Sequence, residues 1–214
     1  MPTTSTPSFE LFFDVLQTLE DIGAPYMIIG AFAAMIYGTT RVTYDVDIIV
    51  DLADEHIQAL AAAYPLPRYY ADPEQMRSAT RDGTMFNIID STRGEKADLI
   101  PLTMNSAYRQ AFARRVRQTF RFPPIGTFTV WCARADDVVV GKLMAWKEGR
   151  STKHRSDILE LLISYYLDAD ALVAATFDWA YTDRRARALG DDVAAFWHHL
   201  DQAARQRAAR EAAP

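Results

Sequence analysis

The spacing of apolar residues changes character about two thirds of the way along the chain. Up to residue 133, short apolar runs alternate with segments whose apolar residues recur every three or four positions. Short runs are typical of buried strands, and the longer period is typical of helices that pack one face on a core. From residue 135 onward only the helical period remains. The pattern predicts strands at 26–29, 43–52, 85–89, 97–102 and 127–133, and helices at 8–22, 31–37, 53–64, 72–81, 105–115, 135–149, 154–167, 169–180 and 183–210.

This order of elements predicts an α/β (α+β) fold in two parts. Residues 1–133 are expected to form a mixed sheet with helices, and residues 134–214 an all-helical region that packs on it. The sequence has no internal repeat and no Gly/Ser-rich linker. Two packed parts with a cleft between them are a common place for a small-molecule site.

Composition narrows the class of protein further. The chain is 50% hydrophobic with a net charge of −5, which is typical of a soluble globular protein and disfavours one that coats nucleic acid. No run reaches the ~18 apolar residues of a membrane span, and the N-terminus does not resemble a secretory signal, so a cytoplasmic protein is expected. Cys132 is the only cysteine, which excludes an intramolecular disulfide and a cysteine-rich zinc site.

Two aspartates on one predicted strand are the main candidates for chemistry. Side chains alternate along a strand, so Asp45 and Asp47 point the same way while Val46 and Ile48 point into the core. Two like charges this close repel each other unless a cation lies between them. Magnesium is bound by carboxylate oxygens and is commonly completed by substrate phosphates. The alternative is that both aspartates flank an exposed edge strand and pair with Arg41.

The residues upstream fit a phosphate-bearing substrate. A strand at 26–29 that turns at Gly30 into a helix presents free backbone N–H groups, which can receive phosphate oxygens. Glycine permits a close approach of the backbone, and Ala31 adds little bulk. Arg41 lies four residues before Asp45, where it can meet phosphate or steady the carboxylates.

These residues resemble the nucleotidyltransferase superfamily that includes the DNA polymerase beta-like enzymes. They are most similar to its small bacterial members related to abortive-infection toxins. The shared pattern is a strand, a glycine followed by glycine or serine, a helix and then G-x-x-R-x-T-x-D-x-D. In this chain it is formed by Gly30, Ala31, Gly38, Arg41, Thr43, Asp45 and Asp47. Ala31 departs from the pattern because it lacks a hydroxyl that can touch phosphate.

The resemblance extends over residues 26–162 and implies further site residues. A third carboxylate on a neighbouring strand would complete the metal cluster, and Asp98 is the candidate; its alternative is a turn aspartate that pairs with Lys96. Lys142 corresponds to the family's triphosphate-binding lysine; its alternative is a solvated lysine whose stem covers the core. The implied set is Asp45, Asp47 and Asp98 for metal and catalysis, and Gly30, Ala31, Arg41, Thr43 and Lys142 for the nucleotide.

The function that the resemblance implies is transfer of a nucleoside monophosphate from a nucleoside triphosphate to an acceptor hydroxyl. Two Mg²⁺ ions and ATP or another triphosphate are expected, and the family suggests a toxin of a toxin–antitoxin pair that acts on tRNA or other RNA. An antitoxin protein would then be a partner. The alternatives are nucleotidylation of an aminoglycoside-type antibiotic and a non-catalytic nucleotide-binding or partner-binding module on the same fold.

Overall fold

The computed structural model describes residues 9–41, 43, 46–122 and 126–212. Within them the chain forms ten helices and one mixed sheet of seven strands, which confirms the mixed α/β class. Its contacts divide the chain into two compact units. The sheet unit consists of Met1–Ile28 and Thr43–Cys132, and the helical unit of Ile29–Val42 and Ala133–Pro214. The predicted domain boundaries themselves stay a prediction.

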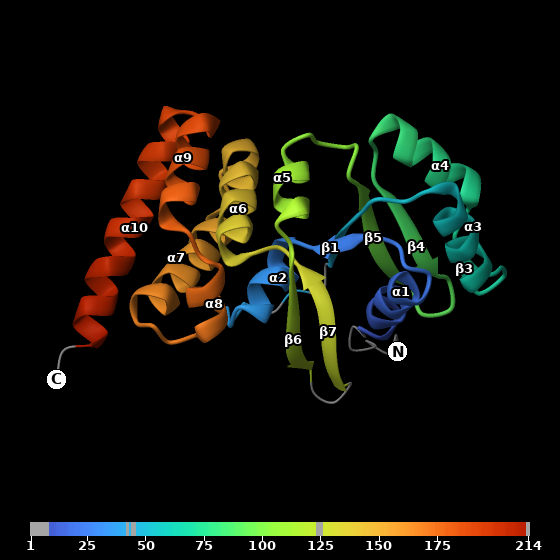
Figure 1. Cartoon of the computed structure of the whole chain (residues 1–214), viewed down its shortest axis with the longest axis horizontal. Helices are drawn as coiled ribbons and strands as arrows, with labels where there is room; N and C mark the ends of the chain where they lie inside the picture. Colours follow the sequence, from blue (N-terminus) through green and yellow to red (C-terminus); the bar gives the residue numbers. More distant parts are fainter. Residues whose placement is uncertain (1–8, 42, 44–45, 123–125, 213–214) are drawn as a thin grey trace, which may run out of the picture. The chain divides into compact units, whose positions relative to one another are not determined.

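The sheet unit contains all the described strands, in the order β3-β4-β5-β2-β1-β7-β6. The pairs β2/β5 and β1/β7 are parallel, and the other neighbours are antiparallel. Figure 1 shows β6 and β7 as a two-stranded ribbon. The strands are β1 (Tyr26–Ile28), β2 (Asp47–Val50), β3 (Tyr69–Tyr70), β4 (Phe86–Asp90), β5 (Glu95–Pro101), β6 (Val116–Phe122) and β7 (Gly126–Cys132), and the helices are α1 (Glu10–Asp21), α3 (Asp54–Ala63), α4 (Pro73–Asp82) and α5 (Tyr108–Ala113).

The helical spacing of its apolar residues explains why α1 packs on this sheet. Its buried residues, such as Leu16 and Leu19, recur at helical spacing, and the helix contacts β5. Phe13 of α1 stacks on Phe128 of β7, with ring centroids 3.9 Å apart. One face of the β6–β7 ribbon is therefore covered by aromatic side chains, and the core of the unit lies between α1 and the sheet.

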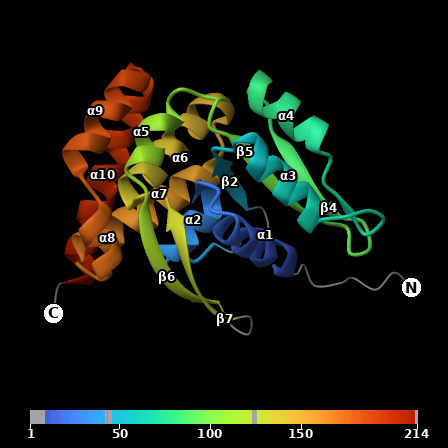
Figure 2. The ribbon, with the colours of Figure 1, turned by 45° about the vertical axis from the view of Figure 1, so that its right-hand side comes forward.

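The helical unit joins the short helix α2 to the C-terminal helices. Its helices are α2 (Gly30–Ile36), α6 (Ala135–Gly149), α7 (Thr152–Tyr166), α8 (Ala171–Thr176), α9 (Trp179–Leu189) and α10 (Asp191–Glu211). α10 packs on α7 and α9, and α6 packs on α2, α7 and α9. The rotated view of Figure 2 shows α9 and α10 side by side. Trp197 of α10 is fully buried in this core.

Several predicted elements need correction. Within the described residues the strand predicted at 43–52 is formed only by β2, from Asp47 to Val50, and the two-residue strand β3 was not predicted. Residues 116–122 form the strand β6, which was not predicted. Its two arginines interrupt the apolar pattern, and pairing with β7 stabilises it as a strand. The predicted helix at 183–210 is interrupted at Gly190, whose φ of +131° lies outside the helical region, so that α9 and α10 are separate. The predicted helix at 169–180 is also divided, since Phe177 is extended.

None of the described helices is long and apolar enough to cross a membrane.

Candidate functional site

Asp47 and Asp98 are register partners on the neighbouring parallel strands β2 and β5. Partners in a sheet share a face, so both carboxylates project from the same side, as the predicted metal site requires. Asp47 opens β2, and the apolar residues that follow it are buried. Asp45, the third predicted ligand, lies outside the described residues. The structure therefore brings together the two predicted carboxylates that it describes.

The Asp98 carboxylate is held by polar neighbours on both sides. Asn87, its register partner on β4, donates a hydrogen bond from Nδ2 to Oδ1. Lys96 donates from Nζ to both carboxylate oxygens at 3.0 Å. The Lys96 side chain is 55% exposed and that of Asp98 only 13% exposed. The alternative interpretation of Asp98 is thus correct in its ion pair with Lys96. It is wrong in its location, because Asp98 lies within β5 and not in a turn.

The donor chemistry at this position fits magnesium. Asp47 and Asp98 supply hard carboxylate oxygens, which are the ligands that Mg²⁺ prefers, and Asn87 steadies one of them. The exposed stem of Lys96 can move away without unpacking the core. Among the described residues no group of three His, Cys, Asp or Glu side chains is placed to hold a metal ion. The predicted cluster thus depends on Asp45 as the third carboxylate.

The predicted nucleotide-binding residues lie in both units. Thr43 is buried in the sheet unit. Gly30 and Ala31 are the first two residues of α2, which begins at Gly30 and not at the predicted residue 31. Gly30 has a φ of +70°, a conformation that favours glycine. The nucleotide contacts assigned to these residues stay predictions.

Lys142, Asp157 and Arg41 form a buried ionic cluster in the helical unit. Arg41 donates from Nε and Nη2 to the two carboxylate oxygens of Asp157, both at 2.9 Å. Lys142 of α6 also donates to Oδ2 of Asp157, which lies on α7. The side chains of Lys142 and Asp157 are 4% and 1% exposed. Lys142 is therefore neither the solvated lysine of the alternative reading nor an unpaired cation.

The surroundings of this cluster shift two pKa values. Burial acts to raise the pKa of Asp157, but hydrogen bonds from Arg41 and Lys142 outweigh it, and the pKa lies below its usual range. The pKa of His154 is lowered, first by burial and then by the charges of Lys142 and Lys153. The charges of Lys142 and Arg41 contribute to both shifts.

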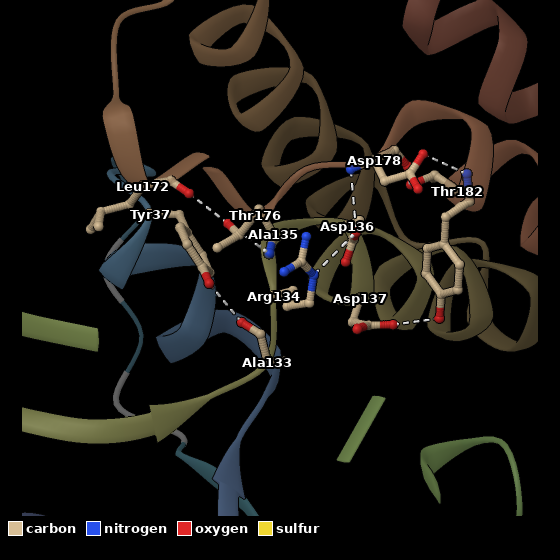
Figure 3. Close-up of polar contacts among 11 residues, drawn as sticks. Tyr37, Ala133, Arg134, Ala135, Asp136, Asp137, Leu172, Thr176, Asp178 and Thr182 are labelled. Atoms are coloured by element: carbon tan, nitrogen blue, oxygen red, sulfur yellow. Dashed lines mark hydrogen bonds and ion pairs between the residues drawn. The ribbon is translucent and has the colours of Figure 1, made fainter. Parts of the chain in front are cut away.

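The first turn of α6 is fixed by buried polar groups that the sequence analysis did not identify (Figure 3). Asp136 accepts a hydrogen bond from the backbone N–H of Asp178 at 3.2 Å. Asp137 accepts one from the hydroxyl of Tyr181 at 2.6 Å. Both aspartates are buried at the helix N-terminus, where negative charge is stabilised. They anchor α6 to α9, and with it the helix that carries Lys142.

One sequence feature could have pointed to this anchor. Adjacent aspartates before a Val-Val-Val run are typical of a helix start. The hydroxyl of Tyr37, just after α2, donates to the carbonyl of Ala133 at 2.9 Å and ties the end of α2 to the residues before α6. The partners of these groups are about 40 to 100 positions away in the sequence, which is why spacing alone did not reveal them.

Lys147 binds a backbone carbonyl and is not part of the cluster of Lys142, Asp157 and Arg41. Its Nζ donates to the carbonyl of Leu189, the last residue of α9, at 2.7 Å. A cation at a helix C-terminus satisfies a carbonyl that has no partner within the helix.

No protein-family model matches the chain, and no curated protein matches it. The resemblance to nucleotidyltransferases therefore rests on the residues of the first motif and on their chemistry.

Proposed function

We propose that the protein is a magnesium-dependent nucleotidyltransferase that moves a nucleoside monophosphate from a nucleoside triphosphate to an acceptor hydroxyl. The observation that carries the proposal is the pairing of Asp47 with Asp98 on one face of the sheet. Aspartate is uncommon in strands, and two on adjacent strands repel each other unless a cation lies near them. The Lys96 ammonium pairs with Asp98, and because its side chain is 55% exposed it can give way to a metal ion. RNA, and tRNA in particular, is the proposed acceptor class, as for a toxin of a toxin–antitoxin pair in the cytoplasm.

In this reaction the acceptor oxygen forms a bond to the α-phosphorus, and the bond between that phosphorus and the bridging oxygen to the β-phosphate breaks. Pyrophosphate leaves, and the hydroxyl proton passes to Asp98 or to water. Bound magnesium would neutralise charge on the triphosphate. Asp47, Asp98 and Asp45 would hold it, while Asn87 keeps the Asp98 carboxylate in one orientation. Catalysis of this kind depends on positioning and on charge neutralisation.

The buried cluster of the helical unit supports an anionic substrate. Lys142 and Arg41 both donate to the Asp157 carboxylate, which holds an ammonium and a guanidinium close together. Both groups are of the kind that binds phosphate oxygens, and a triphosphate has oxygen acceptors for both. We propose Lys142 and Arg41 as nucleotide-binding residues and Asp157 as the residue that positions them.

The test is label transfer from each α-labelled triphosphate to total RNA in the presence of magnesium. Wild type is compared with Asp98→Asn and Asp47→Asn, and Asp82→Asn serves as control because it removes an exposed carboxylate in α4 of the same unit. We expect losses of at least about 100-fold for the first two variants and none for the control. Equal transfer by wild type and Asp98→Asn would refute the catalytic assignment. Transfer to aminoglycosides but not to RNA would support the antibiotic alternative.

A further inference from the structure

Positive charge is concentrated in one stretch of the chain. Between Asp98 and Asp136 the sequence has six arginines and no acidic residue, although the net charge of the whole chain is −5. All 28 acidic residues lie outside the intervening positions. Within the sheet unit the stretch includes α5, β6 and β7. Its arginines in that unit are Arg109, Arg114, Arg115, Arg117 and Arg121.

The β6–β7 ribbon presents part of this charge on one face. Every second register pair of the ribbon lies on the same side, and three such pairs lie on the side opposite Phe128, which packs on α1. Thr119, Arg121, Thr127 and Thr129 are exposed on that side. We call it the ribbon face; its residues are Arg117 and Trp131, Thr119 and Thr129, and Arg121 and Thr127, each pair directly opposite across the ribbon.

The arginines differ in how far their charge is already neutralised. Arg117 donates to both carboxylate oxygens of Glu20 at 2.9 Å, so its charge is paired. Arg121 and Arg109 are exposed, and neither side chain makes a hydrogen bond or ion pair with any described residue. Two exposed guanidinium groups are thus available to an anion.

Arg115 lies stacked on aromatic rings beside the ribbon face. Its guanidinium carbon is 4.2 Å from the centroid of Phe112 and 4.9 Å from that of Trp131. Nη1 donates to the carbonyl of Phe112 at 2.8 Å, but Nε is buried without a hydrogen-bond partner among the described residues. Burial lowers the pKa of Arg115, and only the more distant charge of Asp51 opposes this. None of the described carboxylates pairs with this partly desolvated guanidinium, so an anion beside it is stabilised.

The register of the sheet places the ribbon face on the side of the candidate carboxylates. Met27 of β1 pairs with Ile49 of β2, which shares a face with Asp47. Ile28 pairs with Cys132, so Trp131 alternates onto the same face as Met27. Trp131 is two strands away from Asp47, or about 10 Å across the sheet. The ribbon face and the candidate carboxylates therefore lie on the same side of one sheet. Met27 and Ile49 between them are fully buried, so an RNA strand that joins the two places has to pass over the residues that cover them.

We propose that the ribbon face, together with Arg115, binds an RNA strand and presents it to the carboxylates as acceptor. The acceptor role rests on the proposed function, whereas binding alone does not. Guanidinium forks suit phosphate geometry, and the Thr hydroxyls on the same face can bond to phosphate or ribose oxygens. The Trp131 ring holds the guanidinium groups of Arg115 and Arg117 beside this face. A polycationic aminoglycoside would be repelled by this surface.

The test is fluorescence anisotropy with a short labelled single-stranded RNA, without triphosphate or magnesium, in about 50 mM salt. Arg121→Glu is compared with Arg81→Glu, which reverses the charge of an exposed arginine in α4 of the same unit. We expect Arg121→Glu to weaken binding about tenfold or more, because a charge-assisted phosphate contact becomes repulsive, and Arg81→Glu to change it little. Arg121→Gln should make the slope of log K against log salt shallower by about 0.7. Arg115→Lys, which keeps the charge, should also weaken binding.

The outcomes separate this proposal from the proposed function. If wild type does not bind the RNA, or if Arg121→Glu and Arg81→Glu weaken binding equally, the ribbon face is not the RNA surface; an acidic protein would then be the occupant to test. Asp98→Asn should bind RNA as wild type does. If it binds normally and also transfers label normally, the catalytic assignment fails while the RNA surface stands. Unfolding midpoints confirm that each variant is folded.

Discussion

Lys142 and Asp157 form an ion pair between α6 and α7 in which both side chains are almost completely buried. Burying either charged group alone would cost free energy, and the attraction between the two groups offsets part of that cost. Arg41 shares the carboxylate and is itself 32% exposed, so the pair is connected to the protein surface through a second cation. This arrangement makes the cluster sensitive to the loss of any one member.

Asp157→Asn should destabilise the protein by about 3–5 kcal/mol, because it leaves the Lys142 ammonium buried without its carboxylate. Lys142→Met should cost less, since Asp157 keeps its bidentate bond to Arg41. Urea unfolding of the two variants measures the difference. If Asp157→Asn is as stable as wild type, the Lys142 ammonium does not depend on this carboxylate.

Stability should fall as the pH drops below about 6.5. The pKa of His154 is lowered in the folded protein, so the unfolded chain takes up the proton first and is favoured as the pH falls. Asp157 does not contribute in this range, because its stabilisation is present above its unfolded pKa of about 3.9. Unfolding free energies at pH 7.5 and 5.5 should differ more for wild type than for His154→Gln. An identical pH dependence in both proteins would contradict the burial of His154.

Asn87→Ala should lower the proposed nucleotidyltransferase activity about 10- to 100-fold, because the Asp98 carboxylate loses a hydrogen bond that orients it. The magnesium concentration for half-maximal activity should rise, which a purely structural effect would not produce. Asn87→Asp is a useful companion variant, since it adds a repelling charge in place of the amide. If Asn87→Ala has the same magnesium dependence as wild type, Asn87 does not orient a metal-binding carboxylate.

Two glycine substitutions should have opposite effects. Gly190→Ala should destabilise by about 1–3 kcal/mol, because residue 190 has a φ of +131° and a Cβ there would lie 3.1 Å from Oδ1 of Asp192. Gly141→Ala should stabilise by about 0.5–1 kcal/mol, because this position is helical and a Cβ meets nothing within 4 Å. Thermal unfolding of both variants provides the comparison. Stabilisation by Gly190→Ala would contradict the break between α9 and α10.

Local pattern determined most of the elements. Hydrophobic period and turn residues placed β1, β4, β5 and α6 within a few residues, because these signals act over a few neighbours. Asp98 was selected through the family resemblance, and its position opposite Asp47 agrees with that choice. The second half of the chain was recognisable as helical for the same reason.

Tertiary structure alone decided the contacts between distant segments. β6 is a strand because β7 pairs with it, and the ribbon face exists only because that pairing brings Trp131 opposite Arg117. The burial of Lys142 and its pairing with Asp157 depend on the packing of α6 against α7. Spacing along the sequence specifies which face of an element a side chain occupies. Which other element meets that face is set by the packing of the whole core, and a single sequence read locally does not contain that information.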